Sequence, residues 1–155
     1  MNIEKAKQIY DTLNEALDQR GWKYDADPEH LAIRTGVIGD DFPIGIYFIV
    51  DPKRDCVTFR TTNITEFTSE QLLEAAVATC SANNGLVFGH FTLDVTDGAF
   101  YYSYSDSYEG CEVTPAFFQN MISIAVATVD HYNDRFIMLQ KGALTLKKFL
   151  EMDNK

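Results

Sequence analysis

The sequence predicts an α+β domain in which an antiparallel sheet of about five to six strands has its helices mainly on one face. Three observations lead to this prediction. Apolar residues recur at helical spacing over residues 3–20, 68–84 and 114–140. Between the first two of these segments, residues 22–62 alternate apolar and polar side chains, which is typical of strands. Residues 86–106 have the alternation and the central turn of a β-hairpin.

Length and composition indicate a single folded domain over residues 1–155. A chain of 155 residues can bury a core without disulfides or a metal. Its 46% hydrophobic and 13% aromatic residues exclude a disordered chain. The formal net charge of −10 argues against binding to nucleic acid or to anionic membranes, because both need clustered basic residues. The acidity either keeps the protein soluble or attracts a basic partner.

Cysteine usage and hydropathy predict a cytoplasmic protein. Cys56, Cys80 and Cys111 are an odd number at wide spacing, which indicates free thiols in a reducing compartment. Residues 1–8 lack the apolar core of a signal peptide. The longest apolar stretch, residues 116–129, is interrupted by polar side chains and falls short of a membrane span.

The first predicted element is a helix over residues 3–20, and Gly21 provides a natural stop just past its end. A meander follows, because residues 30–38, 43–50 and 56–62 alternate and are separated by short turns rich in Gly, Asp and Pro. Residues 22–24 are a candidate for a short first strand.

The second helix is predicted over residues 68–84. Thr68 and Gln71 have the spacing of a capping box, in which the two side chains bond each other's backbone amide groups. We expect its buried stripe to consist of Leu72, Leu73, Ala76, Val77 and Cys80, with Cys80 acting as a small hydrophobic residue.

The hairpin is predicted to close on Asp97-Gly98 in a two-residue type I′ turn, which requires positive φ at both central residues. Directly opposed residues in an antiparallel pair share a face. The predicted register therefore gathers three apolar pairs on one face, namely Val95 with Phe100, Leu93 with Tyr102, and Phe91 with Tyr104. The other face collects Asp94 with Tyr101, Thr92 with Ser103, and His90 with Ser105.

The third helix is predicted to open at Thr114-Pro115 and to run to about Gln140, before Gly142 and a short terminal helix over residues 144–152. Apolar residues cover most of its circumference, so it needs two packing partners. One is expected to be the sheet, and the other is either a helix of the same chain or a second subunit. The side chains predicted for a homodimer interface are Phe117, Met121 and Ile124.

Motifs for catalysis, metal binding or cofactor binding are missing from the sequence. His30, His90 and His131 are isolated, without the spacing of a metal site. His90, Asp94 and Ser105 share a strand face, but this face is expected to be solvated or covered by a partner. Asp40-Asp41 is interpreted as a turn, and Asp130 and Asp134 as the solvated stripe of the long helix. No phosphate-binding loop or nucleophile elbow is present. We therefore predict no catalytic, cofactor or metal residues.

A protein-binding surface is the better-supported prediction. Tyr47, Arg60 and Tyr101 point away from the apolar faces of their strands, and Tyr and Arg are enriched at interface hot spots. The alternative is that these are ordinary half-exposed strand residues.

The run NNGLVFGHFTLDVTDGAFYYSYSD resembles the hallmark of the YbjN-type domain family of bacterial sensory transduction regulators. The matching positions are Asn83, Leu86, Phe88, Gly89, Phe91, Leu93 and Asp94. The tail DHYNDRFIMLQKGALTLKKFLEM is also similar to the family's ending, although Lys141-Gly142-Ala143 stands where a paired glycine is common.

The resemblance implies a fold similar to that of class I type III secretion chaperones, which are small, acidic, homodimeric proteins that bind other proteins. The expected function is therefore that of a non-enzymatic protein-binding regulator or chaperone-like adaptor. Two alternatives stay open. A small-ligand sensor would require an apolar cavity beneath the sheet, and a small hydrolase-like enzyme would require a pocket in which His90 meets an acid.

Overall fold

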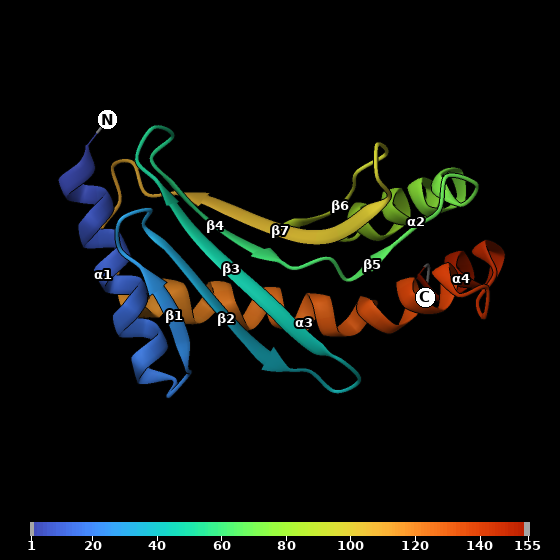
Figure 1. Cartoon of the computed structure of the whole chain (residues 1–155), viewed down its shortest axis with the longest axis horizontal. Helices are drawn as coiled ribbons and strands as arrows, with labels where there is room; N and C mark the ends of the chain where they lie inside the picture. Colours follow the sequence, from blue (N-terminus) through green and yellow to red (C-terminus); the bar gives the residue numbers. More distant parts are fainter. Residues whose placement is uncertain (1, 154–155) are drawn as a thin grey trace.

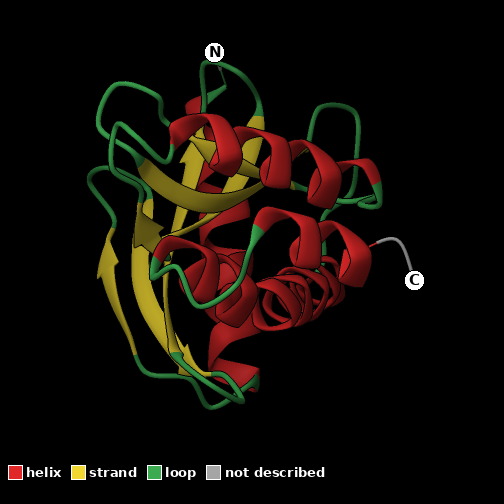
Figure 2. Cartoon of the chain, turned by 90° about the vertical axis from the view of Figure 1, so that its right-hand side faces the viewer, coloured by secondary structure: helices red, strands yellow, loops and turns green. Residues whose placement is uncertain are grey.

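The computed structural model describes residues 2–153 and has two layers, one of strands and one of helices. Figure 2 shows the sheet along one side of the molecule and the helices along the other. This arrangement confirms the predicted α+β class, although the sheet has seven strands rather than five to six. Residue 1 and residues 154–155, which the predicted domain includes, lie outside the described range.

The elements follow the predicted order, with one additional strand. The helices are α1 (Ile3–Gln19), α2 (Leu72–Asn84), α3 (Pro115–Gln140) and α4 (Leu146–Asp153). The strands are β1 (Tyr24–Asp27), β2 (Ala32–Ile38), β3 (Pro43–Asp51), β4 (Cys56–Thr61), β5 (Thr65–Glu66), β6 (His90–Leu93) and β7 (Ala99–Ser107). The unpredicted strand is β5, whose two residues are too few to show alternation.

The sheet is antiparallel throughout, in the order β1-β2-β3-β4-β7-β5, with β6 also paired to β7. The predicted meander forms β1 to β4. One part of β7 pairs with β4, and its beginning pairs with β5 and β6. In Figure 1, α3 runs along the back of the sheet, while α1 lies at one end of the molecule and α2 and α4 at the other.

Helix α1 docks on α3 through both apolar and polar contacts. Its predicted apolar face is buried, and Gly21 ends the helix with a φ of +67°. The Arg20 guanidinium donates to the Gln119 carbonyl (2.9 Å) and to Ser123 Oγ (2.6 Å) on α3. The Gln119 amide in turn donates to the Ala16 carbonyl at 2.7 Å. The second partner that α3 requires is thus supplied by α1 of the same chain.

Helix α2 buries a different face from the predicted one. Its buried residues are Ala75, Ala78, Thr79 and Ala82, whereas Leu73 is 78% exposed, Val77 is 42% exposed and Cys80 is also exposed. Small side chains allow the helix to approach β6 and α4 closely. The prediction is therefore wrong for Leu73, Ala76, Val77 and Cys80, because close backbone packing was favoured over the burial of larger side chains. Leu72, the remaining member of the stripe, is half-buried against the core.

The start of α2 also differs from the prediction. The helix begins at Leu72, because residues 68–71 form a turn. Half of the predicted capping box is present, since the Thr68 amide donates to Gln71 Oε1 at 3.0 Å. The Gln71 side-chain amide donates to the Gln140 carbonyl at 2.7 Å, which ties this turn to the end of α3.

The β6–β7 hairpin exists, but its turn is longer than predicted. The Asp94 amide donates to the Ala99 carbonyl, and the Gly98 amide donates to the Asp94 carbonyl, both at 2.8 Å. Four residues form the loop, and in it only Gly98 has positive φ. The true register shifts every predicted pair by two positions, so that Phe91 faces Tyr102. A shift of two preserves the faces, which is why the predicted apolar face is correct except for Val95, 64% exposed in the loop.

An aromatic cluster joins the hairpin to α3 and α4 in the core. The Phe91 ring stacks on Phe100 with centroids 5.4 Å apart, and Phe100 lies 4.1 Å from Phe136 of α3. Phe136 in turn lies 4.9 Å from Phe149 of α4. All four rings are at most 2% exposed. Such pairs contribute about 0.5–1.5 kcal/mol beyond the burial of their area.

The contacts of Gly98 give a first testable prediction. A Cβ at this residue would lie 1.9 Å from the Phe67 carbonyl oxygen, and its φ is +79°. Gly98→Ala should therefore lower the free energy of unfolding by about 2 kcal/mol or more, measured by urea denaturation. Gly110 is the matched control, because its φ is +70° but a Cβ added there would have no atom within 4 Å. Gly110→Ala should cost only about 1 kcal/mol, and equal losses would contradict the steric explanation.

Alkaline unfolding gives a second prediction. Burial raises the pKa of Tyr102 to about 12, and burial with the Asp153 carboxylate raises the pKa of Tyr132 to about 12, from 10.0. Between pH 10 and pH 12 these two tyrosines keep their protons in the folded protein but lose them in the unfolded chain. The free energy of unfolding should therefore fall as pH rises from about 10 to about 12. Urea denaturation across this range should show a shallower fall for Tyr102→Phe than for wild type. Parallel curves would contradict this assignment.

Candidate functional site

One face of the sheet is uncovered by any described helix, and we call it the outer face. The side chains that point to it include Arg34, Tyr47, Ile49, Arg60 and Tyr101, as the alternation of burial along the strands shows. Their neighbours in sequence point inward and form the core. In Figure 1 α3 runs behind the sheet, and in Figure 2 the helices lie to the right of the sheet and leave its left side open.

The three residues predicted as an interaction surface lie together on the outer face. Tyr47 is directly opposite Arg60 in the pairing of β3 with β4. Arg60 is opposite Ser103 in β7, and Tyr101 is two residues away from Ser103 along that strand. The geometry brings together residues that are far apart in the sequence. A role in binding stays a prediction, but their placement is the one that it requires.

Cation–π contacts order the arginines of this face. The Arg60 guanidinium lies 3.8 Å from the centroid of the Tyr101 ring, and the Arg34 guanidinium lies 5.9 Å from the Tyr47 ring. Tyr47 is 36% exposed and its neighbour Ile49 is 45% exposed. Such contacts restrict the flexible arginine side chains, and both arginines remain exposed.

Open hollows on the outer face offer room for a chain rather than for a small molecule. One is lined by Tyr47, Ile49, Arg60, Thr61, Thr62 and Asn63. A second, lined mainly by β4, β6 and β7, shares Ile49 and Arg60 with it and adds His90 and Tyr101. Both are open to solvent, so they do not enclose a ligand as a typical small-molecule site does.

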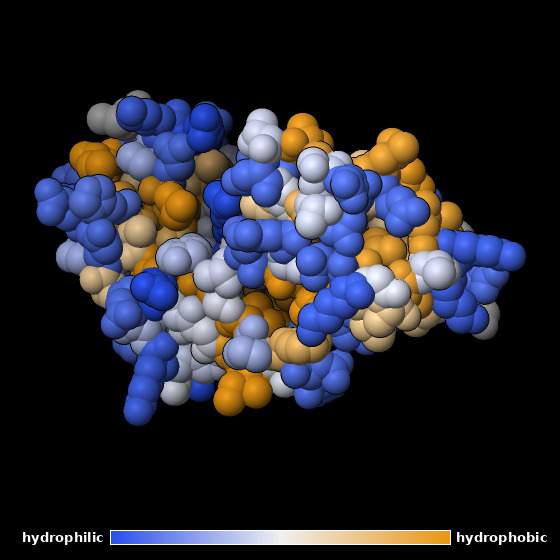
Figure 3. Space-filling view, turned by 45° about the vertical axis from the view of Figure 1, so that its right-hand side comes forward, coloured by the Kyte–Doolittle hydropathy of each residue, from blue (hydrophilic) through white to orange (hydrophobic). Residues whose placement is uncertain are grey.

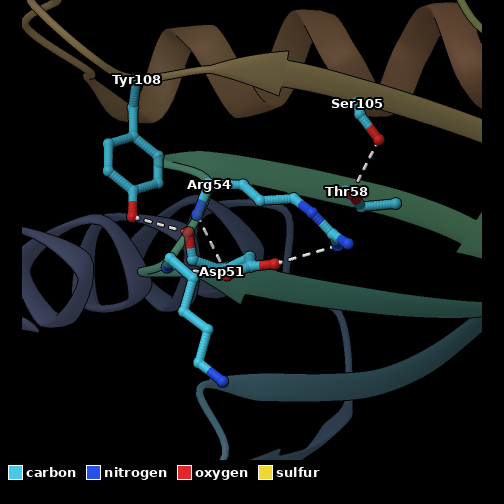
Figure 4. A network of polar contacts seen from close by, with 6 residues as sticks. Asp51, Arg54, Thr58, Ser105 and Tyr108 are labelled. Carbon is cyan, nitrogen blue, oxygen red and sulfur yellow. Dashed lines mark hydrogen bonds and ion pairs between the residues drawn. The ribbon is translucent and has the colours of Figure 1, made fainter. Parts of the chain in front are cut away.

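A polar network fixes one end of the outer face. In Figure 4, Arg54 pairs with Asp51 across the β3–β4 turn, with 3.3 Å between Nη1 and Oδ2. The Tyr108 hydroxyl donates to the Asp51 carbonyl at 3.2 Å. Thr58 and Ser105 join β4 to β7 through their hydroxyls at 2.7 Å. These contacts hold the turn and two strands in place.

The groups required for a catalytic triad do not converge around His90. Ser103, rather than the predicted Ser105, is opposite His90 in the sheet. Asp94 Oδ1 accepts from the amide (2.9 Å) and the hydroxyl (2.6 Å) of Thr96, and these bonds lower the pKa of the Asp94 carboxyl. The Ser105 hydroxyl is engaged with Thr58. Asp94 and Ser105 therefore form structural hydrogen bonds with other residues, and Ser105 is not opposite His90.

A second group of polar residues gathers where the β2–β3 loop meets α3. A hollow there is lined by Asp40, Asp41, Asp130, His131 and Asp134, among others. The Asp40 amide donates to Asp130 Oδ1 at 2.9 Å, so one carboxylate serves to hold the loop. Among residues 2–153, no three His, Cys, Asp or Glu side chains are arranged to hold a metal ion.

A small cavity lies between the sheet and α3. Its volume is about 50 Å³, and it is lined by residues of β3, β4 and α3 that include Ile44, Val129 and Asn133. The Asn133 Nδ2 atom is buried and has no hydrogen-bond partner in the described structure. This space suits a water molecule, whereas small-molecule sites are typically about 300–1,000 Å³.

The three cysteines are free thiols, as the sequence predicts. Cys80 and Cys111 are exposed, while Cys56 is half-buried at the end of β4. Burial raises the pKa of the Cys56 thiol, and the nearby Asp51 carboxylate adds to this effect. The thiol form, which is favoured here, is the unreactive one.

The predicted dimer helix is largely occupied within the chain. Met121 is 1% exposed and belongs to the core, while Phe117 and Ile124 are half-buried against it. An apolar stripe is instead exposed on α2, where Leu73, Ala76, Val77 and Cys80 recur at helical spacing. Figure 3 shows apolar atoms reaching the surface among polar ones on the upper right of the molecule. Sequence periodicity identifies this stripe but assigns it to the core.

The residues of the hallmark motif have structural roles. The Asn83 side chain accepts from the Phe91 amide at 2.7 Å and donates to the Phe91 carbonyl at 2.9 Å, which joins α2 to β6. Gly89 has a φ of +67°, and a Cβ there would lie 2.1 Å from the Tyr102 hydroxyl oxygen. That hydroxyl donates to the Phe88 carbonyl at 2.8 Å. The motif thus preserves the junction of α2 with the hairpin.

Comparison with solved structures confirms the chaperone-like fold. Crystalline YbjN from E. coli, a putative transcription regulator, has 16% identity and a TM-score of 0.61, over 79% of this chain and 87% of that chain. A chain of the HopA1–SchA chaperone–effector complex has 10% identity and a TM-score of 0.58, with coverages of 84% and 95%. A chain of the ExsC–ExsE complex has 12% identity and a TM-score of 0.55, with coverages of 83% and 93%.

Sequence comparison identifies the family. No curated protein matches the chain significantly. Within residues 2–153, no helix has the length and hydropathy needed to cross a membrane. The sequence profile of the YbjN family, "Putative bacterial sensory transduction regulator", matches residues 10–138, which is well over half of the chain. The protein therefore belongs to the YbjN family.

Proposed function

We propose that the protein is a non-enzymatic regulator or chaperone-like adaptor that binds another protein through the outer face of its sheet. The observation that carries the proposal is the gathering of Tyr47, Arg60 and Tyr101 on a sheet face that no described helix covers. Exposed aromatic and arginine side chains held in fixed positions are characteristic of interface hot spots.

The structural relatives support a protein partner. One was solved in the chaperone–effector complex of HopA1 with SchA, and another in the complex of ExsC with ExsE. At 10% and 12% identity these relatives establish a shared fold and no more, since fold does not determine function. The proposal for this chain therefore rests on its own outer face.

The two alternatives receive less support from the geometry. A small-ligand sensor needs a cavity that encloses most of its ligand, and the space beneath the sheet is about 50 Å³. A hydrolase-like enzyme needs an acid beside His90, but Asp94 is bonded to Thr96 and Ser105 to Thr58. The free thiols favour the reducing cytoplasm as the place of action.

A homodimer is part of the proposal, and α2 is the surface that we favour for it. The exposed stripe of Leu73, Ala76, Val77 and Cys80 spans two helical turns and has no packing partner among the described residues. A second copy of the stripe would cover it in an isologous contact. The residues predicted from the sequence, Phe117, Met121 and Ile124 on α3, are the competing site.

Site-specific photo-cross-linking tests the proposed binding face. A photo-reactive benzoylphenylalanine at position 47 should cross-link a reproducible partner protein in native cells, because this position lies at the centre of the outer face. The same group at Lys147, exposed on α4, is the matched control and should not label that partner. No cross-link at position 47, or equal labelling from both positions, would contradict the proposal.

Light scattering tests the dimer. Wild type should have the mass of two chains, and Val77→Asp should give a folded monomer, because a charge would be placed in the apolar contact. Glu74→Gln, also exposed on α2, should remain dimeric. If Ile124→Asp gives the folded monomer while Val77→Asp stays dimeric, the interface lies on α3. A monomeric wild type would reject the dimer, and circular dichroism establishes that each variant is folded.

A further inference from the structure

We propose that the outer face selects an acidic segment of the partner protein, with Arg60 and Arg34 as the main contacts for its carboxylates. This inference rests on the proposed function, because it names the chemistry of the partner that the same face would bind. It follows from two guanidinium groups, those of Arg34 and Arg60, that lie beside exposed apolar side chains and form no ion pair among residues 2–153.

The outer face concentrates arginine in an acidic protein. The chain has a formal net charge of −10 and contains only five arginines. Three of them, Arg34, Arg54 and Arg60, lie on this face or at its end. Carboxylates lie here as well, since Asp51 pairs with Arg54 and Asp25 is opposite Arg34. The arginines that can attract a further carboxylate are therefore those without an ion pair.

Strand register places two arginines and a tyrosine in one row across the sheet. Arg34 is opposite Tyr47, Tyr47 is opposite Arg60, and Arg60 is opposite Ser103. His90 is opposite Ser103 and completes the row. With strands about 4.8 Å apart, the backbones of Arg34 and Arg60 lie roughly 10 Å from each other, with the backbone of Tyr47 between them. An extended segment that crosses the strands could meet both.

The two central arginines have no carboxylate partner among residues 2–153. Arg54 is paired with Asp51, but Arg34 and Arg60 form no ion pair in the described structure. Asp25 is opposite Arg34 in the sheet and still forms no ion pair with it. The Arg60 guanidinium lies 3.8 Å from the Tyr101 ring centroid and the Arg34 guanidinium 5.9 Å from that of Tyr47. A guanidinium without a carboxylate partner can donate to an incoming carboxylate in a bidentate manner.

The apolar residues of the face refine the partner's chemistry. Tyr47 and Ile49 are both exposed, and Tyr101 is half-exposed, beside the arginines. A segment that mixes acidic with apolar or aromatic residues would satisfy both kinds of group. A basic segment would be attracted by the net charge of the chain but would meet guanidinium groups here. A nucleic acid is disfavoured, because a long polyanion would be repelled by the remaining acidic surface.

Labelled peptides test this inference by fluorescence anisotropy. The probe is a fluorescein-labelled peptide of three Glu-Leu-Glu-Tyr repeats, compared with peptides in which Gln or Lys replaces every Glu. The acidic peptide should bind most tightly, and added salt should weaken it. Tighter binding of the Lys peptide, equal binding of all three, or no binding would overturn the inference. Equal binding of a labelled thymidine oligonucleotide would also overturn it, since any polyanion would then suffice.

Variants identify the contacts. Arg60→Gln should weaken binding of the acidic peptide about fivefold, which is the modest effect typical of exposed ion pairs. The double variant, Arg60→Gln with Arg34→Gln, should weaken it about tenfold or more. The matched control is Arg135→Gln on α3, which removes the same charge from an arginine 5.4 Å from a tyrosine ring in the helical layer. If Arg135→Gln weakens binding as much as Arg60→Gln, net charge explains the result and the inference fails.

The outcomes separate this inference from the proposed function. If position 47 cross-links a partner but the acidic peptide is not preferred, the outer face binds proteins and only the charge preference is wrong. If position 47 cross-links nothing, the proposed function itself fails. Far-UV circular dichroism and urea denaturation should show Arg60→Gln to be folded and only slightly less stable than wild type, because Arg60 is exposed and loses its contact with the Tyr101 ring but no ion pair within residues 2–153.

Discussion

The aromatic cluster of Phe91, Phe100, Phe136 and Phe149 is the contact on which the arrangement of the layers depends. It fixes the β6–β7 hairpin against α3 and brings α4 to the same site. Once α3 lies along the inner face, α1 docks on it and completes the cover. The helices are committed to one side, and the other side of the sheet is left to solvent or to a partner.

The packing of α2 shows how close approach can be favoured over hydrophobic periodicity. The helix has two candidate faces, one of large apolar residues and one of small residues. The small face is buried, and Asn83 then pairs with the backbone of Phe91 as a neighbouring strand would. Deeper contact of the helix with β6 and α4 offsets the exposure of Leu73 and Val77. The packing of α2 against the hairpin therefore leaves the apolar stripe of α2 exposed on the opposite side of that helix.

The outer face combines features that are uncommon in a protein of this charge. Two guanidinium groups contact tyrosine rings and form no ion pair among residues 2–153, while the chain as a whole is acidic. The net charge of the chain does not describe the groups available on this face, because salt screens charges more than about 10 Å apart. Under the proposed function, Arg34 and Arg60 would supply the selectivity for the carboxylates of a partner.

The sequence by itself determined the α+β class, most element positions and the placement of Tyr47, Arg60 and Tyr101 on one face, because strand alternation and short turns are local properties. Tertiary structure decided the length of the hairpin loop, where the Phe67 carbonyl packs against Gly98, and the buried face of α2. It also decided that α1 covers α3. These outcomes depend on how closely elements distant in sequence can approach one another, which periodicity along one segment does not encode.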